Sequence, residues 1–189
     1  METINGAHIA IGIEPSSMES FIKLQELVQA KAQEKIDTKT IKATKSPHIT
    51  VDFLWQSTLE IWKERMQHTI KRSKLGEGLK DIQLGTIKSF TSNKEKNKYI
   101  VYIEIIGWES FFQSLRDDWY SIQIPHITLC EINDTSHPEE AISSILQWLN
   151  EDKDIANYMR EILINTNVIE LRYKDTINQT AQKIVNAIS

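Results

Sequence analysis

The string Pro-His-Ile-Thr occurs twice in the sequence, at residues 47–50 and 125–128. Each copy opens an apolar run typical of a β-strand, over residues 49–54 and 127–132. Side chains alternate between the faces of a strand, so the His and the Thr two residues later lie on one face. If the two strands are neighbours, two proton-transferring imidazoles and two hydrogen-bonding hydroxyls meet on one patch of sheet.

The two motifs resemble those of the 2H phosphoesterase superfamily, which carries a His-hydrophobic-Thr string at the start of two strands. Here the strings span residues 48–50 and 126–128, each preceded by Pro. The family includes RNA 2',3'-cyclic phosphodiesterases, the so-called 2'-5' RNA ligases and phage enzymes that cleave cyclic nucleotide signals. In sequence the resemblance covers only these two strands, whereas in the order of expected elements it covers nearly the whole chain.

The chemistry that suits this set of side chains is phosphodiester transfer at a ribose. One imidazole deprotonates the attacking oxygen and the other protonates the leaving oxygen, both near neutral pH. Hydroxyl donors stabilise the charge that grows on the phosphoryl oxygens. The resemblance implies that His48 and His126 are the base and the acid, in an order that the sequence leaves open, and that Thr50 and Thr128 hold the phosphate.

The remaining histidines and a few polar residues have a weaker claim to a place in the site. A structural role is the simplest interpretation of His8, His68 and His137, although a first strand beside the site could present His8 to substrate. Possible substrate contacts that share a strand face are Tyr102 with Glu104 and Arg172 with Lys174. None of these residues is included in the predicted site.

We expect no metal and no other cofactor. The two motif histidines supply only two metal ligands, and no HExxH motif or carboxylate cluster adds more. The single cysteine, Cys130, excludes an internal disulfide and a cysteine-based zinc site. These features, with no secretory signal at the start of the sequence, predict a cytoplasmic protein.

The composition is that of an ordinary globular protein, with 40% hydrophobic and 25% charged residues among 189. No apolar run approaches the roughly 20 residues that a membrane-spanning helix needs. The net charge is −4, with a basic excess in residues 1–98 and an acidic excess in residues 99–189. Because proteins that grip long nucleic acids usually carry a broad basic surface, the expected partner is a small nucleotide or a short RNA, not a long duplex.

Periodicity and turn residues predict an alternation of strands and helices. The expected strands lie at residues 7–14, 49–54, 81–91, 99–106, 127–132 and 168–174, with the third and fourth forming a hairpin. The expected helices lie at residues 16–35, 57 to about 76, 108–119, 136–149, 152–163 and 176–188. The lysine-rich stretch 36–46 is expected to be a connecting loop.

This order predicts an α+β or layered α/β protein. The resemblance narrows it to a duplicated, two-lobed α+β fold, in which mainly antiparallel sheets line a central cleft and helices lie outside. We expect one domain over residues 1–189, with pseudo-repeat lobes at about 1–92 and 98–189.

The predicted function is a metal-independent phosphoesterase for 2'-linked or cyclic phosphates. Its substrate would be either an RNA end or a cyclic or 2'-5' signalling nucleotide, as in the phage members of the family. The alternative from another class is a binding module that sequesters a nucleotide or RNA without turnover.

Overall fold

An eight-stranded sheet organises the part of the chain that the computed structural model describes, and every strand pairing in it is antiparallel. The strand order is β4-β5-β6-β3-β1-β7-β8, and β2 pairs with β6 off this path. The structure describes residues 3–35, 38–58, 60–61, 63–65, 67–68, 82–91, 98–107, 125–135, 139–173 and 176–177.

The strands are β1 (Thr3–Ile13), β2 (Thr38–Ala43), β3 (His48–Thr58), β4 (Gln83–Thr91), β5 (Tyr99–Ile106), β6 (His126–Thr135), β7 (Ile164–Tyr173) and β8 (Thr176–Ile177). The helices are a 3-10 turn η1 (Pro15–Ser17), α1 (Met18–Lys35), α4 (Glu139–Glu151) and α5 (Lys153–Glu161). Residues 60–61, 63–65 and 67–68 are also helical, in agreement with the helix predicted there.

The α+β class and the strands that carry the two motifs are confirmed. The predicted hairpin is also confirmed, because β4 and β5 pair antiparallel along their length. The break between α4 and α5 falls at Asp152, whose side chain caps the second helix by accepting a hydrogen bond from the backbone N–H of Ile155 at 3.0 Å. β1 and β7 both start earlier than predicted.

The connecting loop predicted at residues 36–46 was wrong, because Thr38–Ala43 forms β2 and pairs antiparallel with β6. Among the described strands β2 pairs only with β6, so it is an edge strand of this part of the sheet. Edge strands often carry lysine, which discourages pairing with other chains. The lysines that suggested a loop are therefore compatible with a strand, and the pairing partner decides between the two.

The final helix predicted at residues 176–188 does not start where expected. Thr176 and Ile177 form the short strand β8, which pairs antiparallel with the end of β7. The remainder of that predicted helix and the predicted helix 108–119 lie outside the described residues.

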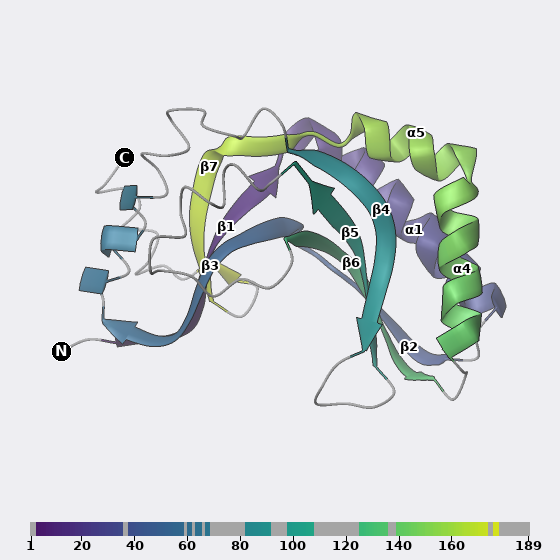
Figure 1. Ribbon diagram of the computed structural model, residues 1–189, viewed down its shortest axis with the longest axis horizontal. Helices are drawn as coiled ribbons and strands as arrows, with labels where there is room; N and C mark the ends of the chain where they lie inside the picture. Colours follow the sequence, from purple (N-terminus) through teal and green to yellow (C-terminus); the bar gives the residue numbers. More distant parts are fainter. Residues whose placement is uncertain are drawn as a thin grey trace.

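One face of the sheet packs against the helices and forms the core. Phe21, Leu24 and Val28 lie on one side of α1 and expose almost no surface. They belong to the same buried cluster as Ile49 of β3 and Ile127 of β6. Figure 1 shows α1, α4 and α5 gathered beside β4, β5 and β6, whereas β1, β3 and β7 extend away from these helices.

None of the described helices is both long enough and apolar enough to cross a membrane.

Cys130 offers a test of the core. Its side chain is fully buried in β6, and burial, followed by the neighbouring carboxylate of Glu131, raises the pKa of the thiol to about 12. Because the thiolate is the reactive form, the thiol should react very slowly with a disulfide reagent at pH 8 and rapidly in denaturing urea. A Ser143→Cys control adds an exposed thiol on α4 and should react at once with one equivalent. Fast reaction of native Cys130 would contradict the described packing of β6.

Candidate active site

The two Pro-His-Ile-Thr motifs lie beside each other because the strands that they open are neighbours. β3 and β6 pair antiparallel at Ile49 and Ile127, the middle residues of the two motifs. Both Ile side chains face the core, with exposed fractions of 2% and 0%. The His and Thr of each motif are half-buried and, by strand alternation, lie on the other face.

The register relates the four polar side chains to one another. In an antiparallel pair, a step of one residue from the Ile49–Ile127 contact places His48 across from Thr128 and Thr50 across from His126. The two imidazoles are then diagonal neighbours, a relation that separates Cβ atoms by roughly 7–8 Å. We name the sheet face that carries these four residues the histidine face.

Each motif is followed by the same backbone irregularity. The register between β1 and β3 passes over Val51, and the register between β5 and β6 passes over Leu129. Both residues come directly after the Thr of their motif, so each motif ends in a β-bulge. In β6, Leu129 and Cys130 are both fully buried, so the alternation of buried and half-buried residues is interrupted at the bulge and resumes after it in the opposite phase.

His48 is held from two sides. Its Nδ1 donates a hydrogen bond to the backbone carbonyl oxygen of Ser46 at 3.0 Å. Its Nε2 lies 3.1 Å from the Nε2 of His8, which β1 contributes to the same face. The two rings are stacked, with centroids 4.9 Å apart and an angle of 26° between their planes.

His126 has a different, aromatic environment. The ring of Tyr102 lies 5.1 Å from the His126 ring and that of Phe90 lies 6.0 Å away, both in edge contacts. Tyr102 is 8% exposed and pairs with Thr128 in the sheet, whereas Phe90 is 44% exposed. Phe90 therefore presents an open aromatic surface beside His126.

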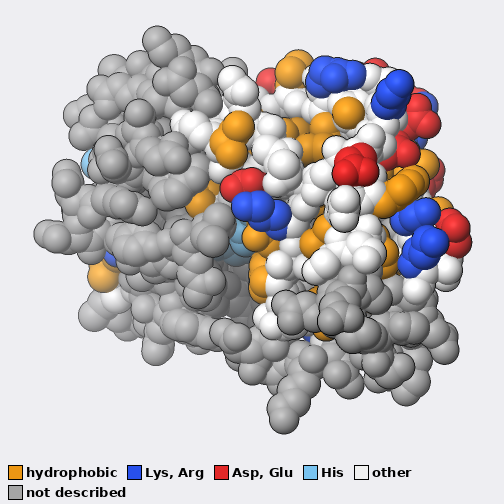
Figure 2. Space-filling view, turned by 45° about the vertical axis from the view of Figure 1, so that its right-hand side comes forward, with side chains coloured by type: hydrophobic (Ala, Val, Ile, Leu, Met, Phe, Trp, Pro, Cys, Tyr) orange, Lys and Arg blue, Asp and Glu red, His pale blue; other side chains and the backbone are white. Residues whose placement is uncertain are grey.

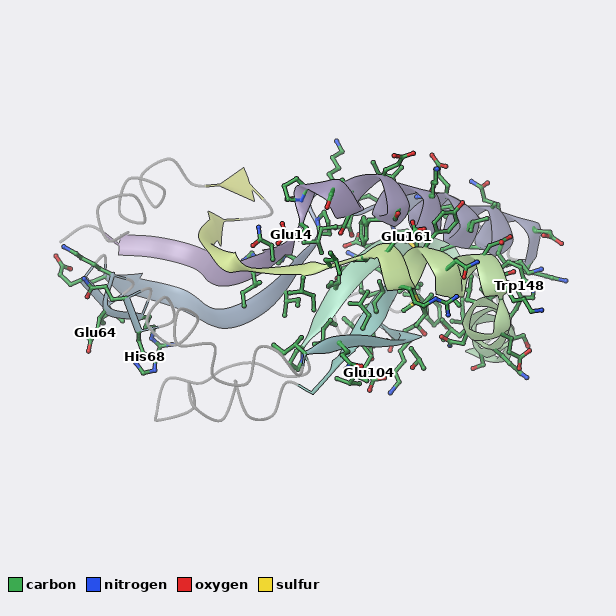
Figure 3. The ribbon with its side chains drawn as sticks, turned by 90° about the horizontal axis from the view of Figure 1, so that it is seen from above. Glu14, Glu64, His68, Glu104, Trp148 and Glu161 are labelled. Carbon is green, nitrogen blue, oxygen red and sulfur yellow. The ribbon has the colours of Figure 1, made fainter. Side chains whose placement is uncertain are left out.

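Glu104 is the residue of β5 that pairs with His126. Its carboxylate accepts hydrogen bonds from Lys88 at 3.1 Å and from the Thr86 hydroxyl at 3.2 Å. The hydrogen bond from Lys88 and the positive charge of that residue, together with the Thr86 bond, hold the pKa of the Glu104 carboxyl below its usual value against a smaller effect of burial. Figure 3 shows Glu104 on the side of the sheet away from α1, which is the side of the histidine face.

The position of β4 beside this carboxylate, Gly85, has little room for a side chain. A Cβ at Gly85 would lie 3.2 Å from Oε2 of Glu104 and 3.0 Å from Cγ2 of Ile106. Glycine at this position, where the register between β4 and β5 shifts, therefore leaves room for the Glu104 side chain.

A buried amide ties the two motif strands to the helix beneath them. Gln25 of α1 is 5% exposed, and its Nε2 donates to the carbonyl oxygen of Leu129 at 2.7 Å and to that of Thr44 at 2.8 Å. Leu129 is the bulge residue of β6, and Thr44 leads into the first motif. The backbone N–H of Thr44 also donates to the Leu129 carbonyl at 3.1 Å. Gln25 thus links the segments that carry both motifs.

Within the described ranges, no group of three or more His, Cys, Asp or Glu side chains is arranged to share a metal ion.

The structure brings together all four predicted site residues, and their catalytic roles stay a prediction. It adds His8, which the sequence analysis left outside the predicted site although it considered a contact with substrate, and Phe90, which the sequence analysis did not name. The alternation of the first strand, with small residues between its isoleucines, was a signal that His8 shares a face with Ala10, and this face meets Thr50 of β3. Arg172 takes the register position beside His8 in β7, whereas Lys174 and His137 lie outside the described residues.

Replacing Gln25 by Met tests the link between α1 and the two motifs. Met is similar in volume but leaves the Thr44 carbonyl without its side-chain donor, so unfolding should become easier by about 1–3 kcal/mol. Urea denaturation measures the change, and Gln33→Met, at an exposed position of the same helix, should stay near wild type. Equal stability of the two variants would show that the amide does not hold the strands.

Comparison with known proteins establishes the fold. No family model and no curated protein sequence matches the chain. Two solved structures of Kluyveromyces marxianus Usb1 are similar to it, one of them with uridine monophosphate. The first has a TM-score of 0.59 at 7% identity, over 92% of this chain and 96% of the other. The second has a TM-score of 0.60 at 6% identity, over 92% and 97%. The chain therefore has a Usb1-like α+β fold over nearly its whole length.

Proposed function

We propose that the protein is a phosphoesterase that acts, without a metal ion, on 2'-linked or cyclic phosphates of nucleotides, oligonucleotide signals or RNA ends. The observation that carries the proposal is the pairing of the two motifs at Ile49 and Ile127, which puts both sets of His and Thr on one sheet face. The resemblance to 2H phosphoesterases supplies the reaction type.

The chemistry assigns a role to each side chain of the histidine face. One of His48 and His126 takes the proton of the attacking oxygen, and the other gives a proton to the leaving oxygen. Thr50 and Thr128 donate hydrogen bonds to the phosphoryl oxygens as these gain negative charge. Substrate would lie across the junction of β3 and β6, so that each motif supplies one proton-transfer group and one donor.

The strand order supports a two-lobed form of the single domain. β4-β5-β6 lies on one side of the junction and β3-β1-β7 on the other, and the strand with the motif is innermost in both groups. A cleft over this junction is part of the proposal. One strand in each group comes from the other half of the sequence. β4 belongs to the first half but joins β5 and β6, and β7 belongs to the second half but joins β1 and β3. The pseudo-repeat boundaries near residues 92 and 98 stay a prediction.

Three observations favour a short nucleotide substrate. Phe90 offers an exposed ring beside His126, and nucleobases stack on such rings. A protein of similar fold has been solved with uridine monophosphate. In the described part of the face drawn in Figure 2, Lys and Arg are interspersed with Asp and Glu, and the net charge is −4. This distribution suits a small anion better than a long duplex.

Single substitutions of His48 and His126 by Ala test the mechanism. With EDTA present, wild-type protein should turn over at least one of 2',3'-cyclic nucleotides, 2'-5' oligoadenylates and cyclic oligonucleotides. Each Ala variant should lose about 10²–10⁴-fold in kcat, the usual worth of a general acid or base. His68→Ala is the matched control, because Figure 3 places His68 near one end of the molecule, away from Glu104. Which substrate is cleaved separates RNA-end processing from destruction of a signal.

Full activity in either of the two Ala variants would refute the assignment of roles. Stoichiometric ligand binding that survives both substitutions, with no product after long incubation, would instead identify a sequestering protein.

Phe90→Leu tests the aromatic surface. Loss of base stacking, worth about 1–3 kcal/mol, should raise KM for a nucleotide substrate roughly 5–150-fold and leave kcat nearly unchanged. Phe90→Tyr keeps the ring and should behave like wild type. An unchanged KM in the Leu variant would exclude stacking of the base on this residue.

A further inference from the structure

His8 is a third imidazole on the histidine face, and a reaction with one acid and one base does not use it. Its side chain is only 9% exposed, although histidine is polar and titratable. Its Nε2 lies 3.1 Å from the Nε2 of His48. A hydrogen bond between these two nitrogens requires that one of them carries hydrogen and the other does not.

The contact with Ser46 fixes the protons of His48. A carbonyl oxygen only accepts hydrogen bonds, so Nδ1 of His48 carries hydrogen whether the ring is neutral or charged. Every proton that His48 takes up or releases therefore passes through Nε2, the atom that faces His8. His8 thus contacts the one nitrogen of His48 that is available for acid–base chemistry.

The distance between the two Nε2 atoms limits how many protons the pair can hold. A hydrogen on both nitrogens would set two donors against each other, and full protonation of both rings would also bring two like charges together, which is unfavourable. A single added proton instead forms a charge-assisted hydrogen bond between the rings, which is stronger than a neutral one. Coupled groups of this kind titrate as a pair, in two steps that belong to neither residue alone.

We propose that His8 is a positioning residue for His48: the two imidazoles share one proton through their Nε2 atoms and act as a single proton-exchanging unit. The stacked rings and the Ser46 contact hold that unit in place on β1 and β3. The catalytic consequence rests on the proposed function, whereas the shared proton can be measured without any substrate.

Other charged or titratable residues occupy neighbouring register positions on the flanking strands. β7 places Arg172 at the register position of His8 and Glu170 two residues further along. β3 contributes Asp52, and β6 contributes His126 diagonally across the junction. All of them remain in the chain when His8 is replaced, so a changed titration of His48 in a His8 variant reports the loss of the shared proton.

NMR titration of the imidazole signals tests the shared proton in the full-length protein. In the wild type, the signals of His8 and His48 should follow each other through two steps, one above and one below the ordinary imidazole value of about 6.5. In His8→Phe, which keeps a ring of similar size, His48 should titrate once, between those two steps. His68→Ala serves as the control and should leave both steps unchanged.

Independent single-step titrations of His8 and His48 in the wild type would overturn the proposal. So would a His48 curve that is the same in His8→Phe and wild type. Should His8→Phe fail to fold, as judged by circular dichroism, the wild-type curves alone decide, and His8→Asn replaces it as the variant.

A kinetic experiment separates this proposal from the proposed function. On a 2',3'-cyclic mononucleotide, His8→Phe should lower kcat by about 10²-fold through misplacement of His48, shift the pH profile and leave KM nearly unchanged. His8→Asn keeps a side-chain N–H and should recover part of kcat without the two-step titration. If His8 and His48 titrate as a pair but the protein is inactive on every substrate, the proposed function is wrong and the shared proton stands. Loss of activity in His48→Ala and His126→Ala, with uncoupled titration, would defeat only the role of His8.

Discussion

The site depends on one short stretch of backbone pairing, the contact of β3 with β6 at Ile49 and Ile127. Away from this contact the strands separate, since β3 follows β1 and β6 runs between β5 and β2. Burial of both Ile side chains favours the contact, by about 1.5–3 kcal/mol for each. Because strand faces alternate, burying the middle residue of a motif places its His and Thr outside the core. The apolar residue between His and Thr therefore positions both motifs.

After the exposed His and Thr of each motif, the strand has to direct side chains into the core again. The bulges at Val51 and Leu129 lie directly after the Thr residues and change the alternation of the strand there. The extra residue changes the phase of the strand, so the residues after it can be apolar without moving the His and Thr. A bulge also displaces backbone groups from the ladder, and these need other partners. In β6 the partner is Gln25 of α1, whose second hydrogen bond reaches the segment before the first motif. The irregularity that shapes the site is therefore anchored in the helix layer.

Features with a local signal could be predicted from the sequence. The motif strands, the hairpin of β4 and β5, and the helices α1, α4 and α5 each carry their own apolar period, and they occur where expected. β2 could not be predicted, because its polar edge is stable only beside β6, a strand far along the chain. The contact of His8 with His48 could not be predicted either. It depends on a register shift between β1 and β3, and a one-residue difference in register would turn a side chain to the other face.

The sheet gives the two motifs matching backbone positions and different neighbours. Opposite Thr50, the neighbouring strand β1 has a small residue, Ala10. Opposite Thr128, the neighbouring strand β5 has a large aromatic residue, Tyr102. Beside the first motif there is room for the imidazole of His8, which contacts His48. His126 instead has two aromatic rings in edge contact with it. A reaction that needs one proton acceptor and one proton donor requires two histidines in unlike surroundings. A near-symmetric frame alone would give two equivalent imidazoles, so the proposed division into proton acceptor and proton donor depends on the residues of β1, β4 and β5 that line it.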